Sequence, residues 1–300
     1  MKKSASYCSS FVSLSLVFLV SSAALAGGYH KEIKKTSEHE VRIKLESAFG
    51  TVIIGKGESE KILVFDLKTH GDEKTNVDVD YHLKNNIGYL NVDRSNDGSH
   101  SFSFHADDDR GSNNFSDFES GSWYLRFTDA IPLSMDVELG VGKGDFDLSG
   151  LNVKDFKLST GASSTILTFG EPNESVIDNF QIESGVSKFV GNNLCNANFR
   201  RFTFEGGVGT YYLNFAGGLS REVDVHVKIG LGAVTLDIPK NIGAKVMYND
   251  TWLSSFTIDR DFTEEHKGTY VTPNYDTAKG KMDIYVESGL GSVKIRRVEE

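Results

Sequence analysis

The chain has 300 residues, and its 32 Lys and Arg against 42 Asp and Glu give a formal net charge of −10. An acidic chain is a poor match for nucleic-acid phosphates, which call for a basic patch, so we expect no nucleic-acid partner. With 20 Phe, 11 Tyr, 30 Gly and only 4 Pro, the composition excludes a low-complexity tract and allows a sizeable core.

Residues 1–26 are predicted to be a secretory signal peptide. Lys2 and Lys3 precede an apolar run from Phe11 to Val20, and small residues follow as far as Ala26, which is the order found in export signals. The run is short for a membrane span, although an uncleaved anchor is the alternative. We therefore expect an exported protein, periplasmic or at the cell surface, whose mature chain begins near Gly27 and has no membrane span.

The rest of the chain is predicted to form one all-β domain. Residues 27–44 are a polar N-terminal lead, and 45–136 are an irregular β region capping a stack of repeats that fills 137–300. Strands are expected at 61–67, 77–83, 88–92 and 123–127, with Asn85-Asn86 as a hairpin turn. A polar loop separates the last two of these strands at 98–122, and a second insertion lies between 258 and 282.

The repeat is visible in the glycine-rich stretch VELGVGKGDFDL at 137–148. Related stretches are VKIGLGAVTLDI (227–238), FEGGVGTYYLNF (204–215), VESGLGSVKI (286–295), LSTGASSTILTF (158–169), IESGVSKFVG (182–191) and LESAFGTVII (45–54). A small residue marks each one, at 50, 142, 163, 187, 209, 232 and 291, and the steps from 142 to 232 are 21, 24, 22 and 23 residues. A further step reaches Ser254, where the pattern continues less cleanly. A period near 22 is typical of a solenoid.

Apolar residues alternate with polar ones on both sides of each marker, and the alternation skips one place at the marker itself. Alternation indicates strands, and the skip indicates a corner. Six of the seven copies have glycine two places before the marker, which fits a bend or a close approach of neighbouring coils. We therefore predict a β-solenoid of ~22-residue coils, with an antiparallel β-sandwich as the architectural alternative.

Two consequences of this pattern can be checked directly. Outward positions should be polar, and the solenoid should stack Val227, Leu231, Val234 and Leu236 in register on Phe204, Val208, Tyr211 and Leu213, all of them buried. Truncating Leu231 to Ala should then cost about 2–5 kcal/mol. A phosphate-binding loop is the other interpretation of 137–148, but such a loop needs a following helix, whereas a second strand is predicted there and the other copies lack Lys143.

The repeats resemble a known family. The run IPLSMDVELGVGKGDFDLSGL, with FKLSTGASS, NFRRFTFEGGVGTYYLNF, VKIGLGAVTLDIPKNIGAKV and the closing MDIYVESGLGSVKI, is similar to the toast-rack domain and, more narrowly, to the C-terminal domain of LiaF-like cell-wall-active-antibiotic-response proteins. The resemblance implies a non-catalytic β-solenoid associated with envelope-stress sensing. Those relatives have transmembrane helices ahead of the domain, where this chain has only an export signal.

One set of side chains suggests an enzyme as the alternative. Glu138, Ser159, Glu183, Glu205, Lys228 and Glu287 precede successive markers at a similar distance and would form a column on one face. A polysaccharide hydrolase or lyase could use carboxylates placed in this way. An exposed row of acids is more often a solvated face, so we predict no catalytic residues.

The remaining candidates are weaker. His100, His105, Asp107, Asp108, Asp109, Asp117 and Glu119 could gather a metal ion, but they lack the ligand spacing of a calcium loop. We expect no metal or cofactor, and a melting-temperature shift below about 2 °C in millimolar calcium. Arg200 and Arg201 are expected to be surface cations, and Cys195 a small buried residue at a turn. Together these features predict a non-enzymatic binding or scaffold module of the bacterial envelope, with an unknown protein or glycan partner.

Overall fold

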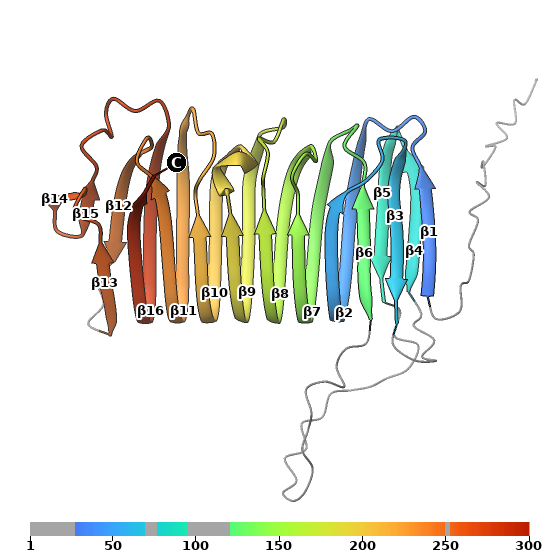
Figure 1. Ribbon diagram of the computed structural model, residues 1–300, viewed down its shortest axis with the longest axis horizontal. Coiled ribbons are helices and arrows are strands. Elements are labelled where there is room, and N and C mark those ends of the chain that lie inside the picture. Colours follow the sequence, from blue (N-terminus) through green and yellow to red (C-terminus); the bar gives the residue numbers. More distant parts are fainter. Residues whose placement is uncertain (1–27, 70–76, 95–120, 250–252, 300) are drawn as a thin grey trace, which may run out of the picture.

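The structure is a computed structural model that describes residues 28–69, 77–94, 121–249 and 253–299. Seven long strands each run down one side of the molecule, bend, and return along the other, so that they stack as a row of U-shaped arches (Figure 1). We name the part before each bend the first arm and the part after it the second arm. The arches are β2 (Glu40–Lys56), β7 (Leu133–Asp147), β8 (Val153–Thr168), β9 (Ile177–Asn192), β10 (Phe199–Asn214), β11 (Glu222–Pro239) and β16 (Lys281–Val298).

Neighbouring arches pair in parallel, and the register runs through the bend. In β10 and β11, Phe204 pairs with Val227 and Leu213 with Leu236, so the same repeat positions lie side by side on both arms. The marker positions Gly50, Gly142 and Ser163 likewise align across β2, β7 and β8. The predicted β-solenoid is therefore confirmed, and the antiparallel sandwich is wrong.

The glycines allow the bends to lie close together. A Cβ on Gly161, two places before its marker, would lie 2.4 Å from the carbonyl oxygen of Gly140 in the arch before it. At the marker itself, Gly232 has φ +138°, and a Cβ there would lie 1.9 Å from the carbonyl oxygen of Gly209. Glycine is needed at such positions for both its backbone freedom and its lack of a side chain. The glycines of 137–148 thus belong to a bend, as predicted.

One set of apolar residues does not lie where the alternation predicted. Val227, Val234 and Leu236 are buried, but Leu231 is 46% exposed and Val208 is 44% exposed. Both residues directly precede a marker, where the chain turns and the side chain points away from the interior of the arch. The predicted burial of these two residues is wrong, and with it the cost predicted for truncating Leu231.

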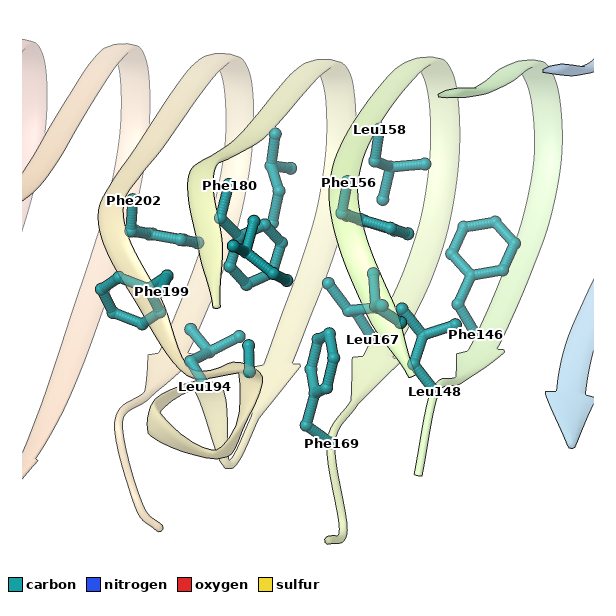
Figure 2. Close-up of a cluster of buried hydrophobic side chains, with 14 of the residues drawn as sticks. Phe146, Leu148, Phe156, Leu158, Leu167, Phe169, Phe180, Leu194, Phe199 and Phe202 are labelled. Atoms are coloured by element: carbon teal, nitrogen blue, oxygen red, sulfur yellow. The ribbon is translucent and has the colours of Figure 1, made fainter. Parts of the chain in front are cut away.

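The interior of the stack is filled by aromatic and aliphatic side chains from both arms (Figure 2). Phe180 lies at the centre of an aromatic group, with ring centroids 5.0 Å from Phe202, 5.5 Å from Phe156 and 5.7 Å from Phe169. Asn173 joins the connections between arches at the end opposite the bends. Its side chain accepts a hydrogen bond from the backbone N–H of Val153 at 2.8 Å and donates one to the carbonyl of Ala197 at 3.2 Å. Packing and polar ladders thus hold the arches together.

Beyond the first arch the same sheet continues as two groups of strands that are antiparallel within themselves. The first arm of β2 pairs with β5 (Ile87–Asp93), which forms a hairpin with β4 (Asp78–Lys84). The second arm pairs with β6 (Ser122–Phe127), which is followed in the sheet by β3 (Lys61–Lys68) and β1 (Gly28–Lys34). Asn85 and Asn86, with φ of 53° and 58°, make the predicted hairpin turn. The four strands predicted here are therefore confirmed, and β1 lies within the segment expected as a polar lead.

At the other end, the order in space departs from the order in the chain. The last strand, β16, pairs with β11 on one side, and on the other with β12 (Gly243–Asn249) and β13 (Ser254–Ile258), which together make the final coil. Ser254 therefore aligns with Gly291 and not with Gly232. The hairpin of β14 (Thr263–His266) and β15 (Thr269–Val271) borders β12.

Two predictions fall on other parts of the chain. The signal peptide at 1–26 and most of the 98–122 loop, including its histidines and aspartates, lie outside the described residues. In the described part, none of the helices has the length and apolar character needed to cross a membrane.

Candidate binding face

The outer surface of the first arms brings the predicted acid column together. Strand pairing places its six members in one row, in the order Glu138, Ser159, Glu183, Glu205, Lys228 and Glu287. Glu46 of β2, which was not predicted, extends the row to a seventh arch. Each lies about 4.8 Å from the next because that is the spacing of paired strands. None of these side chains is buried, so the row faces solvent.

A shallow hollow of about 570 Å³ lies beside the row, between it and the bend. Its floor is backbone, because the next outward-facing position in five successive arches is glycine, at 140, 161, 185, 207 and 230. A second hollow of about 410 Å³ lies on the first arms further from the bend. Glu205 and Lys228 line both hollows. The first hollow crosses five arches, so it forms an elongated depression along the stack.

Several side chains of this face are held in place. The side chain of Gln181 donates to Glu183 at 2.6 Å, and the hydroxyl of Tyr285 donates to Glu287 at 2.7 Å. This hydrogen bond and, to a lesser degree, burial raise the pKa of Tyr285. His226 lies beside the ring of Tyr285, with centroids 5.9 Å apart. The second hollow is therefore lined by two rings, by acids and by the cations Arg201 and Lys228.

The carboxylates of the column all come from one row. Glycoside hydrolysis needs two carboxyl groups that flank the bond to be cleaved, and a single row presents them from one side only. On the bend side, the first hollow is bordered by glycine backbone. The arrangement can accept hydrogen bonds from a chain lying along the stack, but it does not enclose one.

An apolar ridge runs along the bend, next to the glycine floor. The residue before each marker contributes to it, and strand pairing aligns these residues from one arch to the next. The members are Phe49, Val141, Ala162, Val186, Val208, Leu231, Leu290 and, in the final coil, Leu253. Six of them are exposed by 44% to 63%. Sequence reasoning missed this feature because it placed these residues inside.

Of the other predicted candidates, Arg201 lines the second hollow, whereas Arg200 and Cys195 are not among the residues that line either hollow. Arg200 pairs with Asp178 at 3.0 Å and Arg201 with Asp224 at 3.5 Å, both on neighbouring arches. Cys195 is buried in a short 3₁₀ helix (Leu194–Ala197), and burial raises the pKa of its thiol. Within the described ranges, no three His, Cys, Asp or Glu side chains are close enough to hold a metal ion.

The second arms carry an ion-pair cluster that the sequence did not suggest. Arg296 donates twice to Asp237, each time at 2.6 Å, and the hydroxyl of Tyr212 donates to the same carboxylate at 2.6 Å. The three residues come from β16, β11 and β10, so the cluster joins three arches. Its carboxylate is almost fully buried and already holds three donated hydrogen bonds, so the cluster is structural.

Comparison with known proteins identifies the repeat. A family model described as the N-terminal domain of toast_rack, DUF2154, matches residues 22–190, which is more than half of the chain. No curated protein matches. Similar solved structures include a candidate cell adhesion protein from Clostridium sporogenes, with 18% identity, a TM-score of 0.44, and coverage of 90% of this chain and 99% of that one.

Two further structures are candidate adhesins. The protein from Bacteroides fragilis is 11% identical and has a TM-score of 0.34, and the match covers 90% of this chain and 97% of the Bacteroides chain. The protein from Parabacteroides merdae is 10% identical and has a TM-score of 0.31, and the match covers 91% of this chain and 96% of the Parabacteroides chain.

Proposed function

The chain belongs to the toast-rack N-terminal domain family, and from that premise we propose that it is an exported, non-enzymatic binding module of the cell envelope. The observation that carries the proposal is the elongated depression along the first arms, with its in-register row of acids. A repeated surface of this kind suits an extended, repeating ligand lying along the stack, since each arch offers similar groups at a fixed spacing.

A glycan strand is the ligand that this face fits best. Carboxylates such as Glu183 and Glu205 accept hydrogen bonds from hydroxyl groups, and such charge-assisted bonds are stronger than neutral ones. The rings of His226 and Tyr285 offer flat surfaces to the apolar faces of sugar rings. In the bacterial envelope, the abundant strand with hydroxyl groups and apolar ring faces is the cell-wall glycan. Binding to it would connect the module to envelope-stress sensing.

The proposal can be tested with soluble peptidoglycan strands as the probe and dextran as an unrelated glycan. We expect the triple variant Glu183→Gln, Glu205→Gln, Tyr285→Ala to bind peptidoglycan at least tenfold more weakly than the native protein, as measured by calorimetry. The matched control is Asp145→Asn with Thr210→Ala on the second arms, which should change binding less than twofold. Equal binding by all three proteins would refute this choice of face.

The same experiment separates binding from catalysis. If the acid row hydrolysed glycosidic bonds, incubation with peptidoglycan strands would release new reducing ends, and Glu183→Gln or Glu205→Gln would stop the release. We expect none at protein concentrations that give saturated binding. Reducing ends that depend on these two residues would overturn the non-enzymatic assignment in favour of a polysaccharide-active enzyme.

A further inference from the structure

The apolar ridge along the bend is an unpartnered surface of unusual regularity. Its residues lie about 4.8 Å apart, so eight positions span about 34 Å. Val186 is exposed by 63% and Leu290 by 48%. Single exposed apolar residues are common, but a continuous exposed strip marks an interaction surface. The ridge is separate from the acid row proposed to bind glycan.

In two arches, β7 and β9, charged residues of opposite sign flank the ridge, and the glycine floor lies between the ridge and the acids. On the first-arm side, Glu138 and Glu183 belong to the acid row. On the second-arm side, the residue after the marker is Lys143 in β7 and Lys188 in β9, and both lysines are exposed. The acid and the lysine thus occur in the same two arches. β11 lacks this pair, since Lys228 stands in the acid row and the neutral Ala233 follows the marker.

We propose that the ridge is the contact between two copies of this chain, related by a two-fold axis parallel to the stack. Such an axis places each arch opposite the same arch of the second copy, bend against bend. It also places the first arms of one copy beside the second arms of the other. Glu138 then faces Lys143 of the second copy, and Glu183 faces Lys188 of the second copy. Every contact occurs twice, as a two-fold interface requires.

The charges favour this axis over its alternative. A two-fold axis perpendicular to the stack would also bring the ridges together, but it would set first arm against first arm. The glutamates of the two copies would then face one another, and like charges at an interface are unfavourable. The acid row also disfavours an anionic lipid surface as the occupant. A second stack has the same spacing between arches, so apolar residues can meet at every level.

The size of the contact sets its strength. A strip about 34 Å long and about 15 Å wide, including the flanking rows, buries roughly 500 Å² on each copy, or about 1,000 Å² in total. This lies at the lower limit for specific interfaces. We therefore expect a reversible dimer that forms at micromolar concentrations.

The first test measures the oligomeric state of the whole chain by sedimentation velocity between 1 and 200 µM. The native protein should be mostly monomeric at 1 µM and mostly dimeric at 200 µM. Val186→Glu with Val208→Glu should leave it monomeric at 200 µM. Ile166→Glu is the control, because Ile166 is 43% exposed but lies on a second arm away from the ridge, and it should dimerise as the native protein does. A native protein that stays monomeric at 200 µM would overturn the proposal.

The second test fixes the axis by crosslinking single cysteines. The background is Cys8→Ser, with the buried Cys195 left in place, and the two variants are Val141→Cys and Leu290→Cys. In the proposed dimer each residue faces its own equivalent, so each variant alone should form a disulfide-linked dimer on mild oxidation. With a perpendicular axis, position 141 would face position 290, so neither variant alone would crosslink and only their mixture would. That second outcome would refute the proposed axis.

A third measurement separates the dimer from a lipid surface. The native protein should not cosediment with vesicles of phosphatidylethanolamine and phosphatidylglycerol. If they did, and if Val186→Glu with Val208→Glu abolished that binding, the ridge would be a membrane contact and the dimer proposal would be wrong. The dimer turns Glu183, one of the glycan-binding carboxylates, toward Lys188 of the second copy. Glycan binding should therefore be at least as strong in the monomeric Val186→Glu, Val208→Glu variant as in the native protein, so the two proposals can fail separately.

Discussion

Leu231 and Leu236 lie in the same strand but in opposite surroundings, and the pair offers a matched test of how the arches are built. Leu236 is fully buried, whereas Leu231 is 46% exposed on the ridge. Alanine lacks three of the four side-chain carbons of leucine. At about 0.8 kcal/mol for each buried carbon, Leu236→Ala loses about 2.4 kcal/mol in transfer energy, and the cavity left behind brings the total to about 2–5 kcal/mol.

Leu231→Ala should cost far less, under about 1 kcal/mol, because about half of the side chain is already in water and no closed cavity forms. The measurement is urea unfolding followed by tryptophan fluorescence, with unfolding free energies obtained by linear extrapolation. A protein concentration of about 1 µM keeps the chain monomeric if the interface has the micromolar strength expected from its area. If Leu231→Ala cost as much as Leu236→Ala, the outward direction of the ridge would be refuted.

Three further predictions concern the bend, an ion pair and the thiol. Gly232→Ala should destabilise the protein by at least about 2 kcal/mol, because of its positive φ and a Cβ 1.9 Å from the Gly209 carbonyl oxygen, whereas Gly218→Ala, with nothing within 4 Å, should change the unfolding free energy by under about 0.5 kcal/mol. Burial alone would raise the pKa of Glu40, but hydrogen bonds from Lys154 and Arg42 outweigh it and lower the pKa below the usual 4.5. The stability from this group is therefore complete above pH 4.5 and is lost as the pH falls through the lowered pKa. Glu40→Gln should reduce the fall in unfolding free energy at acidic pH. An unchanged dependence on pH would count against the ion pair. Cys195 should resist a thiol reagent in the native protein and react after unfolding in urea, since burial raises its pKa; rapid native labelling would contradict the buried position.

The repeat in the sequence was enough to predict the arches and their register, because alternation and glycine spacing are local properties of each copy. It also predicted the Asn85-Asn86 turn, since two adjacent asparagines readily adopt left-handed conformations. Alternation gives the direction of a side chain only along a straight strand. At the bend that rule fails, so the exposure of Val208 and Leu231 could not be obtained from it.

The acid row was predictable for the same reason that the register was, because residues at one repeat position must align once the coils stack in parallel. The glycine-floored hollow beside it depends on how closely the backbones approach, which spacing alone does not give. The position of β16 was also beyond prediction. All copies of the repeat resemble one another, so similarity does not tell which copy lies next to which. The ion pairs of Asp237 depend on that placement, because Arg296 comes from β16.

The position of β16 between β11 and the final coil has a consequence for how the chain is made. Synthesis delivers a chain from its N-terminus, and arches up to β11 can add one after another as they emerge. The segments β12 and β13 emerge next, but their neighbour in the stack is the last strand of the chain. Although β12 can pair with β15, both segments lack their parallel partner until residues 281–298 arrive and enter between them and β11. Completion of the stack is therefore a post-translational step, and a chain cut short at residue 280 would lack the strand that joins its final coil to the rest.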